Sequence, residues 1–382
     1  MKTLGDLMVS RGGSINPRAF PDEEFELYSI PAHDRGGPEI ALGSEIGSSK
    51  QIVQQGDVMI SKIIPPIRRA RVVDDTSSRR QIASGEWIVF HGQNLDGNYL
   101  RHFLISDDFH GQFMNTVAGV GGSLVRARPE QVKAILVPLP TLDEQRRIAA
   151  ILDHADALRA KRRQVLAHLD TLTQAIFNDM FGSDLLRGDR TELGSLASLI
   201  TKGTTPTSVG LRFTDRGVPF LRAQNLQQGT VRFTSEDLFI DEVAHRTLKR
   251  SVIRPRDLLM SIAGTIGRVA IVPEHRPEMN CNQAVAIVRL SDPSLGTWLM
   301  CWLNSLDARG QIAASSVTAT IANLSLGQIG RLKVPVATVD SMRLLAERVA
   351  AVRVKADIVT RSSAKFDDAF QSLQSRAFRG EL

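Results

Sequence analysis

The fold is decided by the stretch TLDEQRRIAAILDHADALRAKRRQVLAHLDTLTQAIFNDM, Thr141–Met180, which contains neither glycine nor proline. Thr141, followed three residues later by Glu144, forms a capping-box pattern, so a helix is expected to begin here. A helix of about 40 residues with a rise of ~1.5 Å per residue is ~60 Å long. The stretch therefore predicts a long helical rod.

The apolar residues of this rod follow a heptad pattern. Position a holds Ile148, Ala155, Arg162, Leu169 and Ile176, and position d holds Ile151, Leu158, Val165 and Leu172. The pattern returns 201 residues later, at Val349, Val352, Ala356, Val359, Ser363, Phe366, Phe370, Leu373 and Ala377. The polar breaks of the two series, Arg162 and Ser363, coincide. We therefore expect two long helices that pair as an antiparallel coiled coil, with Arg162 beside Ser363. The alternative is two unrelated amphipathic core helices.

Short repeats extend the duplication to the rest of the chain. LGDL at Leu4–Leu7 returns as LGSL at Leu193–Leu196, and GDVMIS at Gly56–Ser61 returns as RDLLMS at Arg256–Ser261. VPLPTLD, which begins at Val137, returns as VPVATVD, which begins at Val334. The chain is therefore a pseudo-two-fold tandem repeat with four segments. These are a globular block at 1–140, a helix at 141–182, a second block at 183–337 and a second helix at 338–382.

The composition is that of a globular protein. The 382 residues are 42% hydrophobic and 23% charged, with a net charge of +6. No apolar run approaches the ~20 residues of a membrane helix, and the N-terminal residues lack the apolar core of a signal peptide, so a cytoplasmic location is expected. Only Cys281 and Cys301 are cysteines, which excludes a disulfide scaffold and an all-cysteine zinc site.

Both globular blocks have the pattern of a mixed α/β (α+β) fold. Short β-rich runs bounded by Gly, Pro or Asn are expected to be strands at Glu86–Phe90, Leu258–Ile262, Arg268–Val272 and Ala284–Leu290. Two apolar runs, Leu295–Ser305 and Leu306–Ala314, are expected to be helices. The blocks lack the regular strand–helix alternation of a doubly wound sheet.

Motifs for catalysis are absent from the sequence. It has no Gly-Lys dipeptide and so no Walker loop, no [DE]-x-K triplet and no [DN]PP[YF] tetrapeptide. HExxH, GxSxG and CxxC are also missing. The glycine-rich stretches at Gly119–Gly122 and Gly264–Gly267 are expected to be turns, because a phosphate-cradling loop should open a helix. We therefore expect a chain without an active site of its own.

The histidines and cysteines fit structural roles better than catalytic ones. His91, His102 and His110 lack metal-ligand spacing and are expected in turns or at the surface. His154 is expected on a solvated helix face. Cys281 and Cys301 are expected to be buried thiols.

Without catalytic motifs, a binding function remains, and two groups of side chains are suited to binding nucleic acid. Arginine, asparagine and glutamine can pair bidentately with guanine or adenine edges in the major groove. The candidates in the first block are Lys62, Arg68, Arg69, Arg71, Arg79 and Arg80. The candidates in the second block are Lys202, Thr204, Arg212, Arg222, Gln224, Asn225, Arg268, Asn282 and Gln283. The alternative is that both groups are ordinary solvated loops.

Several of these motifs resemble those of a known family. VPLPTLDEQRRIAAILDHADALRAKR, Val137–Arg162, is similar to the first conserved helical region of the specificity subunits of type I restriction–modification enzymes. GGSINPRAFPDEEFELYSIP, GSSK and VAGVGGSLVRA resemble one class of their target-recognition domains, and KGTTPT, VPFLRAQNL and IANLSLGQI resemble another. The second helix departs from the pattern, because its opening, VPVATVDSMR, lacks the Glu-Gln pair.

The resemblance implies two target-recognition domains separated by the two helices, each reading one part of a bipartite, asymmetric site in double-stranded DNA. It implies a non-catalytic subunit that directs two adenine-N6 methyltransferase subunits and two restriction subunits. S-adenosylmethionine, ATP and Mg²⁺ would belong to those partners, and no cofactor to this chain. Because both halves need a partner surface, the start of the first helix supplies the candidate partner contacts Glu144, Gln145, Arg146 and Arg147.

Two other functions stay open. The first is a coiled-coil scaffold that binds protein without reading DNA, which retention on DNA at moderate salt would exclude. The second is a nuclease or methyltransferase with an unrecognised active site, which activity of the purified chain alone would reveal.

Overall fold

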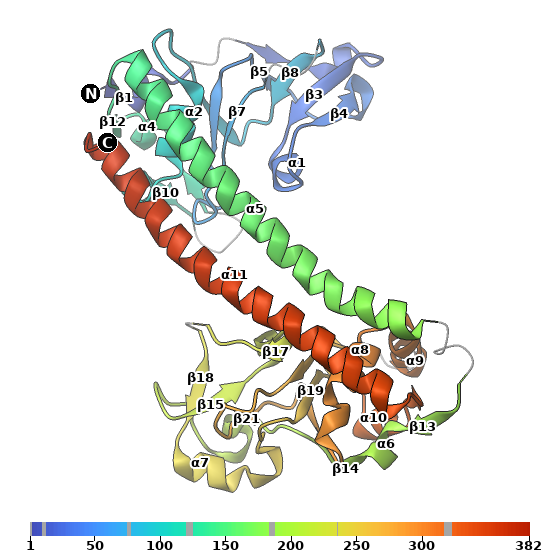
Figure 1. Ribbon diagram of the computed structural model, residues 1–382. Coiled ribbons are helices and arrows are strands. Elements are labelled where there is room, and N and C mark those ends of the chain that lie inside the picture. The colour runs from blue at the N-terminus through green and yellow to red at the C-terminus, as the bar shows by residue number, and fades with distance from the viewer. Residues whose placement is uncertain are drawn as a thin grey trace. The chain divides into compact units, whose positions relative to one another are not determined.

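Two long helices, α5 (Leu142–Phe181) and α11 (Val339–Arg379), dominate the computed structural model (Figure 1). The structure describes residues 2–9, 13–74, 78–119, 125–182, 188–234, 236–316 and 323–382. The predicted start of the first helix is confirmed, because Thr141 Oγ1 accepts a hydrogen bond from the Glu144 backbone N–H at 3.4 Å. The Glu144 carboxylate accepts from the Arg147 guanidinium at 2.7 Å instead of completing the capping box.

The chain forms two compact units, and each contains one end of each helix. The first unit comprises Met1–Arg163 and Arg361–Leu382, and the second comprises Gln164–Thr360. Inside the first unit, α5 begins where α11 ends, and Ile148 shares a core with Ala377. Inside the second unit, the opposite ends of the same two helices meet in one core.

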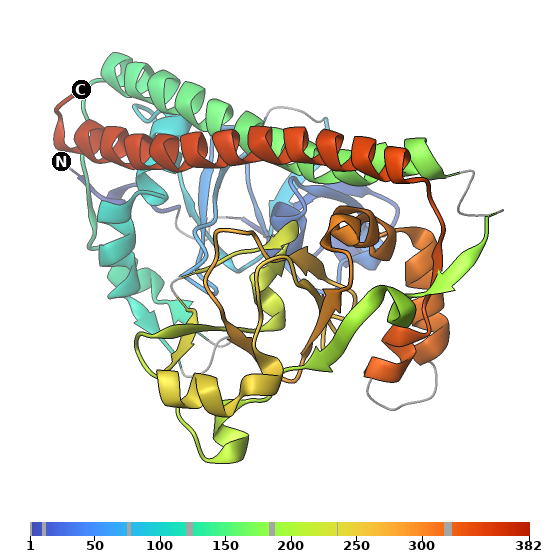
Figure 2. The ribbon, with the colours of Figure 1, turned by 60° about the horizontal axis from the view of Figure 1, so that its bottom comes forward.

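The core of the second unit joins Phe177 and Phe181 of α5 to Leu345 and Val349 of α11. In both units, the beginning of one helix therefore packs with the end of the other. Figures 1 and 2 show the two helices side by side. The predicted antiparallel pairing is confirmed.

The helices differ in how well their heptad register was predicted. All nine α11 positions, Val349 through Ala377, are buried or half-buried, as expected. On α5 the a positions and the predicted d positions Ile151 and Leu158 are also covered, but the predicted d positions Val165 and Leu172 are exposed. Leu166 is half-buried, whereas its neighbour Val165 is 44% exposed. The inner series is Leu152, Arg159, Leu166 and Thr173, one residue after the predicted Ile151, Leu158, Val165 and Leu172.

Arg159 explains the shift in register. Its guanidinium lies 4.3 Å from the centroid of the Phe370 ring, and its Nε donates to Asp367 Oδ1 at 2.6 Å. A long arginine stem with a cation–π contact can therefore occupy a seam position that a hydrophobic pattern assigns to leucine. The polar break is also displaced by one residue, because Arg162 donates to the Ser362 hydroxyl and stacks on Phe366, and does not bond to Ser363.

The first unit contains a five-stranded sheet and a three-stranded sheet. The five strands have the order β2-β5-β8-β3-β4, in which β3 and β8 run parallel. The three strands have the order β7-β6-β9 and are antiparallel. The strands are β1 (Lys2–Thr3), β2 (Ser14–Ile15), β3 (Glu24–Tyr28), β4 (Glu39–Leu42), β5 (Lys50–Ile52), β6 (Val58–Ser61), β7 (Ala70–Val72), β8 (Arg80–Ala83), β9 (Trp87–Phe90), β10 (Val117–Ala118), β11 (Arg126–Ala127) and β12 (Leu136–Val137). The short helices are α1 (Ile30–Asp34), α2 (Gly97–Leu104), α3 (Asp107–Met114) and α4 (Pro129–Val132).

The second unit contains a six-stranded sheet, β14-β22-β19-β20-β17-β16, and a three-stranded sheet, β18-β15-β21. Its strands are β13 (Arg190–Glu192), β14 (Ala197–Lys202), β15 (Val218–Leu221), β16 (Leu226–Gln227), β17 (Gly229–Val231), β18 (Leu238–Ile240), β19 (Leu258–Ser261), β20 (Val269–Ile271), β21 (Asn280–Cys281), β22 (Val285–Leu290) and β23 (Lys333–Pro335). Its short helices are α6 (Leu193–Leu196), α7 (Glu242–Thr247), α8 (Gly296–Leu303), α9 (Leu306–Ser316) and α10 (Leu326–Gly330). The predicted strands at 86–90, 258–262, 268–272 and 284–290 and the predicted helices at 295–305 and 306–314 are therefore confirmed.

The duplication seen in the sequence is present in the topology. The order β7-β6-β9 of the first unit recurs as β20-β19-β22 in the second, and β8-β3-β4 recurs as β21-β15-β18, with the parallel pair conserved. In each unit the first strand pairs with the strand just before the long helix, β1 with β12 and β13 with β23. The chain is thus a tandem of two mixed α/β units, as predicted.

His102 corrects one expectation. It lies on α2 and is fully buried, where its Nε2 is 2.8 Å from Asp153 Oδ1 of α5. Burial and the nearby Arg101 lower the pKa of His102, while Asp153 opposes the shift. The histidine is therefore part of the contact between the domain and α5, and not a surface group. The buried positions expected for Cys281 and Cys301 are confirmed.

Candidate nucleic-acid interface

Two parallel strands of the second unit bring predicted binding residues to one edge. β15 and β21 run parallel, with Leu221 beside Cys281. Arg222 follows the first strand, and Asn282 follows the second, so both leave the sheet at its carboxyl end. The Asn282 backbone N–H donates to Leu221 O at 3.1 Å, which ties the two exits together.

A third loop crosses the same edge at Gly203. The Gly203 N–H donates to Val285 O, and the Thr204 N–H donates to Cys281 O, both at 3.1 Å. A Cβ at Gly203 would lie 2.0 Å from Cys281 O and 2.2 Å from Asn282 O. The backbones approach so closely that only glycine fits, and this contact holds Lys202 and Thr204 beside the Asn282 loop.

The edge continues along the six-stranded sheet to Arg268. Lys202 at the end of β14 pairs with β22, whose first residue, Val285, pairs with Ser261 of β19. The Ser261 N–H donates to Arg268 O at 2.9 Å. Three strand spacings of ~4.8 Å place Lys202 and Arg268 ~14 Å apart, close to the ~12 Å width of the DNA major groove. We call this set the second-unit edge: Lys202, Thr204, Arg222, Gln224, Arg268, Asn282 and Gln283.

The second-unit edge presents hydrogen-bond donors to solvent. Lys202, Gln224, Arg268 and Gln283 are exposed. The Gln283 carboxamide oxygen accepts from the Thr205 hydroxyl, so its NH₂ group is left to face outward. Asn282 is held in the same way, because its Oδ1 accepts from the Ala284 N–H at 3.2 Å. Such donors suit the acceptor edges of guanine, and the lysine suits phosphate.

Two second-unit candidates lie outside this edge set. Asn225 is buried, and its amide donates to Arg232 O at 3.0 Å and to Asp237 Oδ1 at 2.7 Å. Its role is therefore to shape the loop after β15, which corrects the expectation of a base contact. Arg212 is exposed in the loop between β14 and β15.

In the first unit, each of the five predicted arginines has a carboxylate partner. Arg68 pairs with Asp107, Arg69 with Asp34, Arg71 with Asp74, Arg79 with Glu24 and Arg80 with Glu23. Exposed pairs of this kind contribute ~0–1 kcal/mol, so a phosphate can replace the carboxylate at little cost. Arg69 is different, because it is buried and bidentate, with bonds of 2.7 and 2.8 Å to Asp34. The Arg69 side chain therefore stabilises the fold through its pair with Asp34.

The structure also divides these residues between two edges. Arg69 is opposite Ser61 in the hairpin of β6 and β7, as its carbonyl accepts from the Ser61 N–H at 3.0 Å. Ser61 pairs with Trp87 at the start of β9. Arg79 and Arg80 stand at the start of β8, where they pair with residues at the start of β3. Closeness in sequence therefore did not produce one cluster.

Sequence reasoning missed two basic residues of the first unit. Arg126 and Arg128 line a hollow of about 620 Å³ together with Lys62. The Lys62 N–H donates to Glu86 O at 3.0 Å, and Arg126 pairs loosely with the Glu86 carboxylate at 3.3 Å. The sequence signal was the Arg-x-Arg spacing that follows the glycine-rich stretch at 119–122, of which only Gly119 lies within the described residues.

The four predicted partner contacts have different environments. Glu144 pairs with Arg147, and Arg146 lies 3.6 Å from Asp143, so both arginines balance nearby acids. Gln145 is buried and donates to Asn94 O and Pro140 O at 3.1 and 3.0 Å. Gln145 therefore fixes the start of α5 on its domain, which corrects its assignment as a contact residue. The partner roles of Glu144, Arg146 and Arg147 stay predictions.

Within the described ranges, no group of three or more His, Cys, Asp and Glu side chains is arranged to hold a metal ion. No helix in those ranges combines the length and the hydropathy that a membrane span requires.

Known proteins resemble this chain along much of its length. No protein-family model matches it. The specificity subunit of the type I restriction enzyme EcoBI from Escherichia coli is 26% identical over 280 residues, which are 65% of this chain and 58% of the relative. A putative type I specificity subunit, MjaX, from Methanocaldococcus jannaschii is 19% identical over 268 residues, or 66% of this chain and 60% of the relative. The chain is similar to type I specificity subunits. It spans about three fifths of the length of these relatives.

Solved structures share the fold. A chain from a study of complex assembly and conformational transition in a type I restriction–modification system matches with a TM-score of 0.59 and 21% identity, covering 100% of this chain and 97% of that one. The S subunit of a type I system from M. genitalium matches with a TM-score of 0.56 and 13% identity, covering 99% and 95%. Two mixed α/β domains with two long helices are thus the architecture of type I specificity subunits as well.

Proposed function

We propose that this chain is the DNA-reading specificity subunit of a type I restriction–modification complex. Each unit reads one part of a bipartite, asymmetric DNA target, and the helices recruit two methyltransferase subunits and two restriction subunits. Adenine-N6 methylation and ATP-driven restriction belong to those partners, which bind S-adenosylmethionine, ATP and Mg²⁺. This chain uses none of these as a cofactor and acts in the cytoplasm as a non-catalytic adaptor.

The observation that carries the proposal is the repeated unit with different edge residues. The orders β7-β6-β9 and β8-β3-β4 recur in the second unit, yet the β19–β20 hairpin exposes Arg268 where the β6–β7 hairpin carries the ion-paired Arg68 and Arg69. Equal frameworks with unequal side chains suit a target whose two parts differ in sequence. The similarity of the chain to type I specificity subunits supports the same function.

Replacing Gln283 with alanine is expected to relax base discrimination in one half of the target only. A lost base contact costs ~1–3 kcal/mol of discrimination, which is about 5- to 150-fold in relative affinity. Lys202→Ala should weaken binding to all sequences alike and reduce the salt dependence, because a phosphate contact carries no sequence information. Binding to a randomised duplex library at fixed salt measures both effects.

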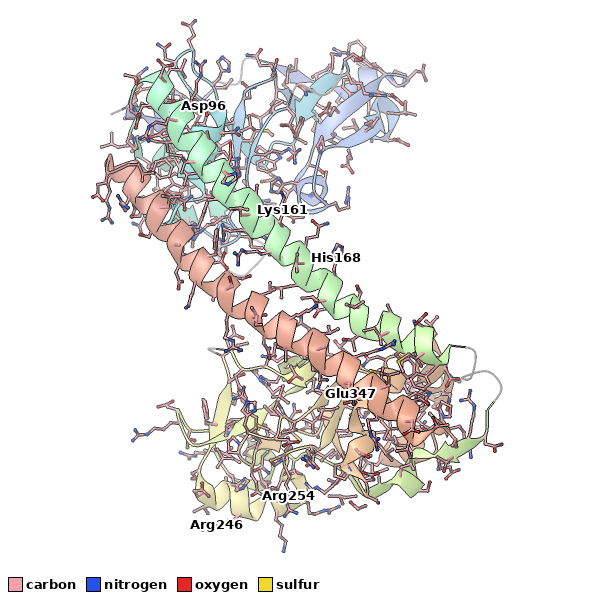
Figure 3. The ribbon with its side chains drawn as sticks, viewed as in Figure 1. Asp96, Lys161, His168, Arg246, Arg254 and Glu347 are labelled. Carbon is pink, nitrogen blue, oxygen red and sulfur yellow. The ribbon has the colours of Figure 1, made fainter. Side chains whose placement is uncertain are left out.

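Arg246→Ala is the matched control for this experiment, since Arg246 is exposed on α7 of the same unit and lies outside the second-unit edge (Figure 3). It should leave the sequence preference unchanged. Discrimination retained by Gln283→Ala at both halves would contradict base reading by this edge. Failure of the chain and its methyltransferase to stay on DNA at moderate salt would favour the scaffold function instead.

The misassigned α5 positions suggest the partner surface. In the second unit, Val165 and Leu172 are 44% and 42% exposed, seven residues apart on one side of α5. On α11 of the same unit, Val354 and Ile358 are exposed as well. Apolar stripes on helices at this spacing pack against other helices. These four residues are the proposed docking surface for a methyltransferase subunit.

Leu172→Lys is expected to reduce co-purification of the chain with its methyltransferase subunit at least tenfold, because a charge in a helix–helix contact is left unpaired and desolvated. Leu199→Lys is the matched control, since Leu199 is 37% exposed on β14 and lies away from both helices. Thermal unfolding should be unchanged for both variants. Equal co-purification of the two variants would remove this surface from the proposal.

A further inference from the structure

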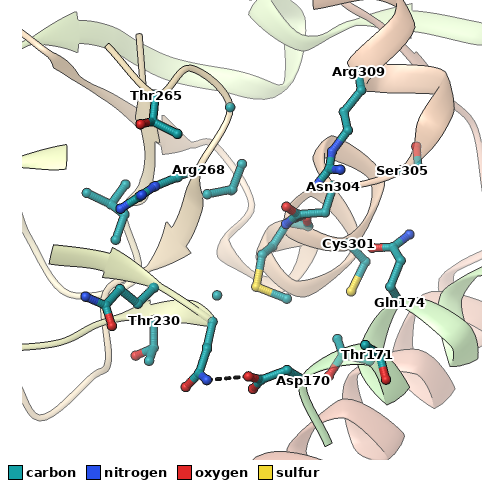
Figure 4. A pocket seen from close by; sticks show the side chains of 18 of the residues that line it. Asp170, Thr171, Gln174, Thr230, Thr265, Arg268, Cys301, Asn304, Ser305 and Arg309 are labelled. Carbon is teal, nitrogen blue, oxygen red and sulfur yellow. Dashed lines mark hydrogen bonds between the residues drawn. The ribbon is translucent and has the colours of Figure 1, made fainter. Parts of the chain in front are cut away.

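A large pocket inside the second unit has no part in the proposed DNA edge beyond one shared residue. Its volume is about 1290 Å³, and all of its walls belong to the second unit. The walls come from α5, α11, the β16–β17 loop, the Gly264–Gly267 turn and α9. Figure 4 shows Arg309 descending from α9 into this space, with Asp170 and Gln174 of α5 on its far side.

The pocket carries an excess of positive charge. Four arginines line it, Arg232, Arg268, Arg309 and Arg353, against two carboxylates, Asp170 and Asp357. Among the described residues, the guanidinium groups of Arg232, Arg268 and Arg309 have no hydrogen bond or ion pair, and the Nε of Arg232 is fully buried. A buried donor without a partner is unfavourable, so a ligand that accepts from it is favoured.

The other charged groups leave this excess in place. Arg353 donates only to Gly229 O at 3.2 Å and to the weak acceptor Met300 Sδ at 2.9 Å, and burial lowers its pKa. Asp170 accepts from Gln228, and burial raises the pKa of this carboxyl while Gln228 and Arg232 oppose the shift.

The corresponding part of the first unit contains an ion pair at the start of helix α3. There, Arg68 donates to Ile105 O at 3.0 Å and pairs with Asp107 at 2.6 Å. Asp107 is the first residue of α3, directly after the capping Ser106. The equivalent first residue of α9 is Leu306, which is 88% exposed. The second unit therefore lacks a carboxylate at the helix position that corresponds to Asp107.

We propose that this pocket binds a small, phosphate-bearing molecule of nucleotide size with an apolar part. Arginine forks match phosphate oxygens, and Met300, Ile266 and Ile312 supply an apolar wall. A volume above the usual ~300–1,000 Å³ of small-molecule sites accommodates such a molecule with water. The apolar wall suits a free ligand with an apolar part better than the phosphate backbone of duplex DNA, which has no apolar group to place against it.

The test uses the full chain and three probes in calorimetric titrations. ATP without metal combines the anion with a flat apolar group, inorganic triphosphate carries the anion alone, and adenosine carries the apolar part alone. ATP should bind at least tenfold more tightly than triphosphate, and adenosine should not bind measurably. Arg309→Gln and Arg232→Gln should each weaken ATP binding about tenfold, as expected for one lost charge-assisted contact. Arg246→Gln should not change it.

DNA binding by the same variants distinguishes the pocket from the second-unit edge. Gln283→Ala should alter DNA discrimination and leave ATP binding unchanged, whereas Arg309→Gln should do the reverse. Circular dichroism and thermal unfolding verify that each variant is folded. The proposal is overturned if no probe binds, if Arg246→Gln weakens ATP as much as Arg309→Gln does, or if Arg309→Gln weakens DNA binding alone. Because ligand binding and DNA reading are measured separately, failure of one leaves the other standing.

Discussion

Replacing Phe370 with alanine should lower the free energy of unfolding by about 3–5 kcal/mol, the range for a buried phenylalanine. Phe370 is 5% exposed and packs in the first-unit core with Ile148 and Leu152 of α5. Its ring also lies 4.3 Å below the Arg159 guanidinium. Truncation therefore opens a cavity between the helices and removes the cation–π partner of a seam arginine.

Urea unfolding of the full chain measures this loss, and hydrogen exchange locates it. Faster exchange should appear in peptides of α5 and α11 that belong to the first unit. Ile358→Ala is the control on the same helix, because Ile358 is 58% exposed, and its truncation should change stability by less than about 0.5 kcal/mol. Equal effects of the two substitutions would mean that Phe370 does not anchor the helix pair.

Local signals account for what the sequence predicted well. A glycine-free stretch with a capping threonine marked the start of α5 to the residue, and the repeated GDVMIS and RDLLMS marked β6 and β19. The α11 register was right, because eight of its nine predicted seam positions are apolar, with Ser363 as the exception. Strand pairing was not predicted, since the order of strands depends on contacts between distant segments.

The errors concern the heptad register of α5 and the grouping of the basic residues in the first unit. The predicted d series of α5 is entirely apolar, whereas the inner series contains Arg159 and Thr173, so hydrophobicity favoured the predicted series. Similarly, Lys62 and Arg80 lie within 19 residues of each other, yet β6, β7 and β8 carry them to different edges. Hydrophobic pattern and proximity along the chain do not encode which end of a strand a loop occupies.

The second large effect is expected at Gly203. Gly203→Ala should destabilise the second unit by about 3 kcal/mol or more, because overpacking a tight site forces the backbone to move. The new Cβ would meet two carbonyl oxygens, Cys281 O at 2.0 Å and Asn282 O at 2.2 Å. Neither can rotate away as a flexible side chain can, so the loop of Lys202 and the loop of Asn282 must separate.

This separation links stability to DNA reading. The Thr204 N–H would lose its bond to Cys281 O, and the Thr205 hydroxyl would lose the Gln283 carboxamide that it orients. Discrimination in the half of the target read by the second unit should therefore fall together with the unfolding midpoint. Gly310→Ala is the matched control, because a Cβ there meets nothing within 4 Å on helix α9, and alanine should stabilise the helix by ~0.5–1 kcal/mol. A Gly203→Ala chain with the stability and sequence preference of Gly310→Ala would show that the close approach of the two loops is not required.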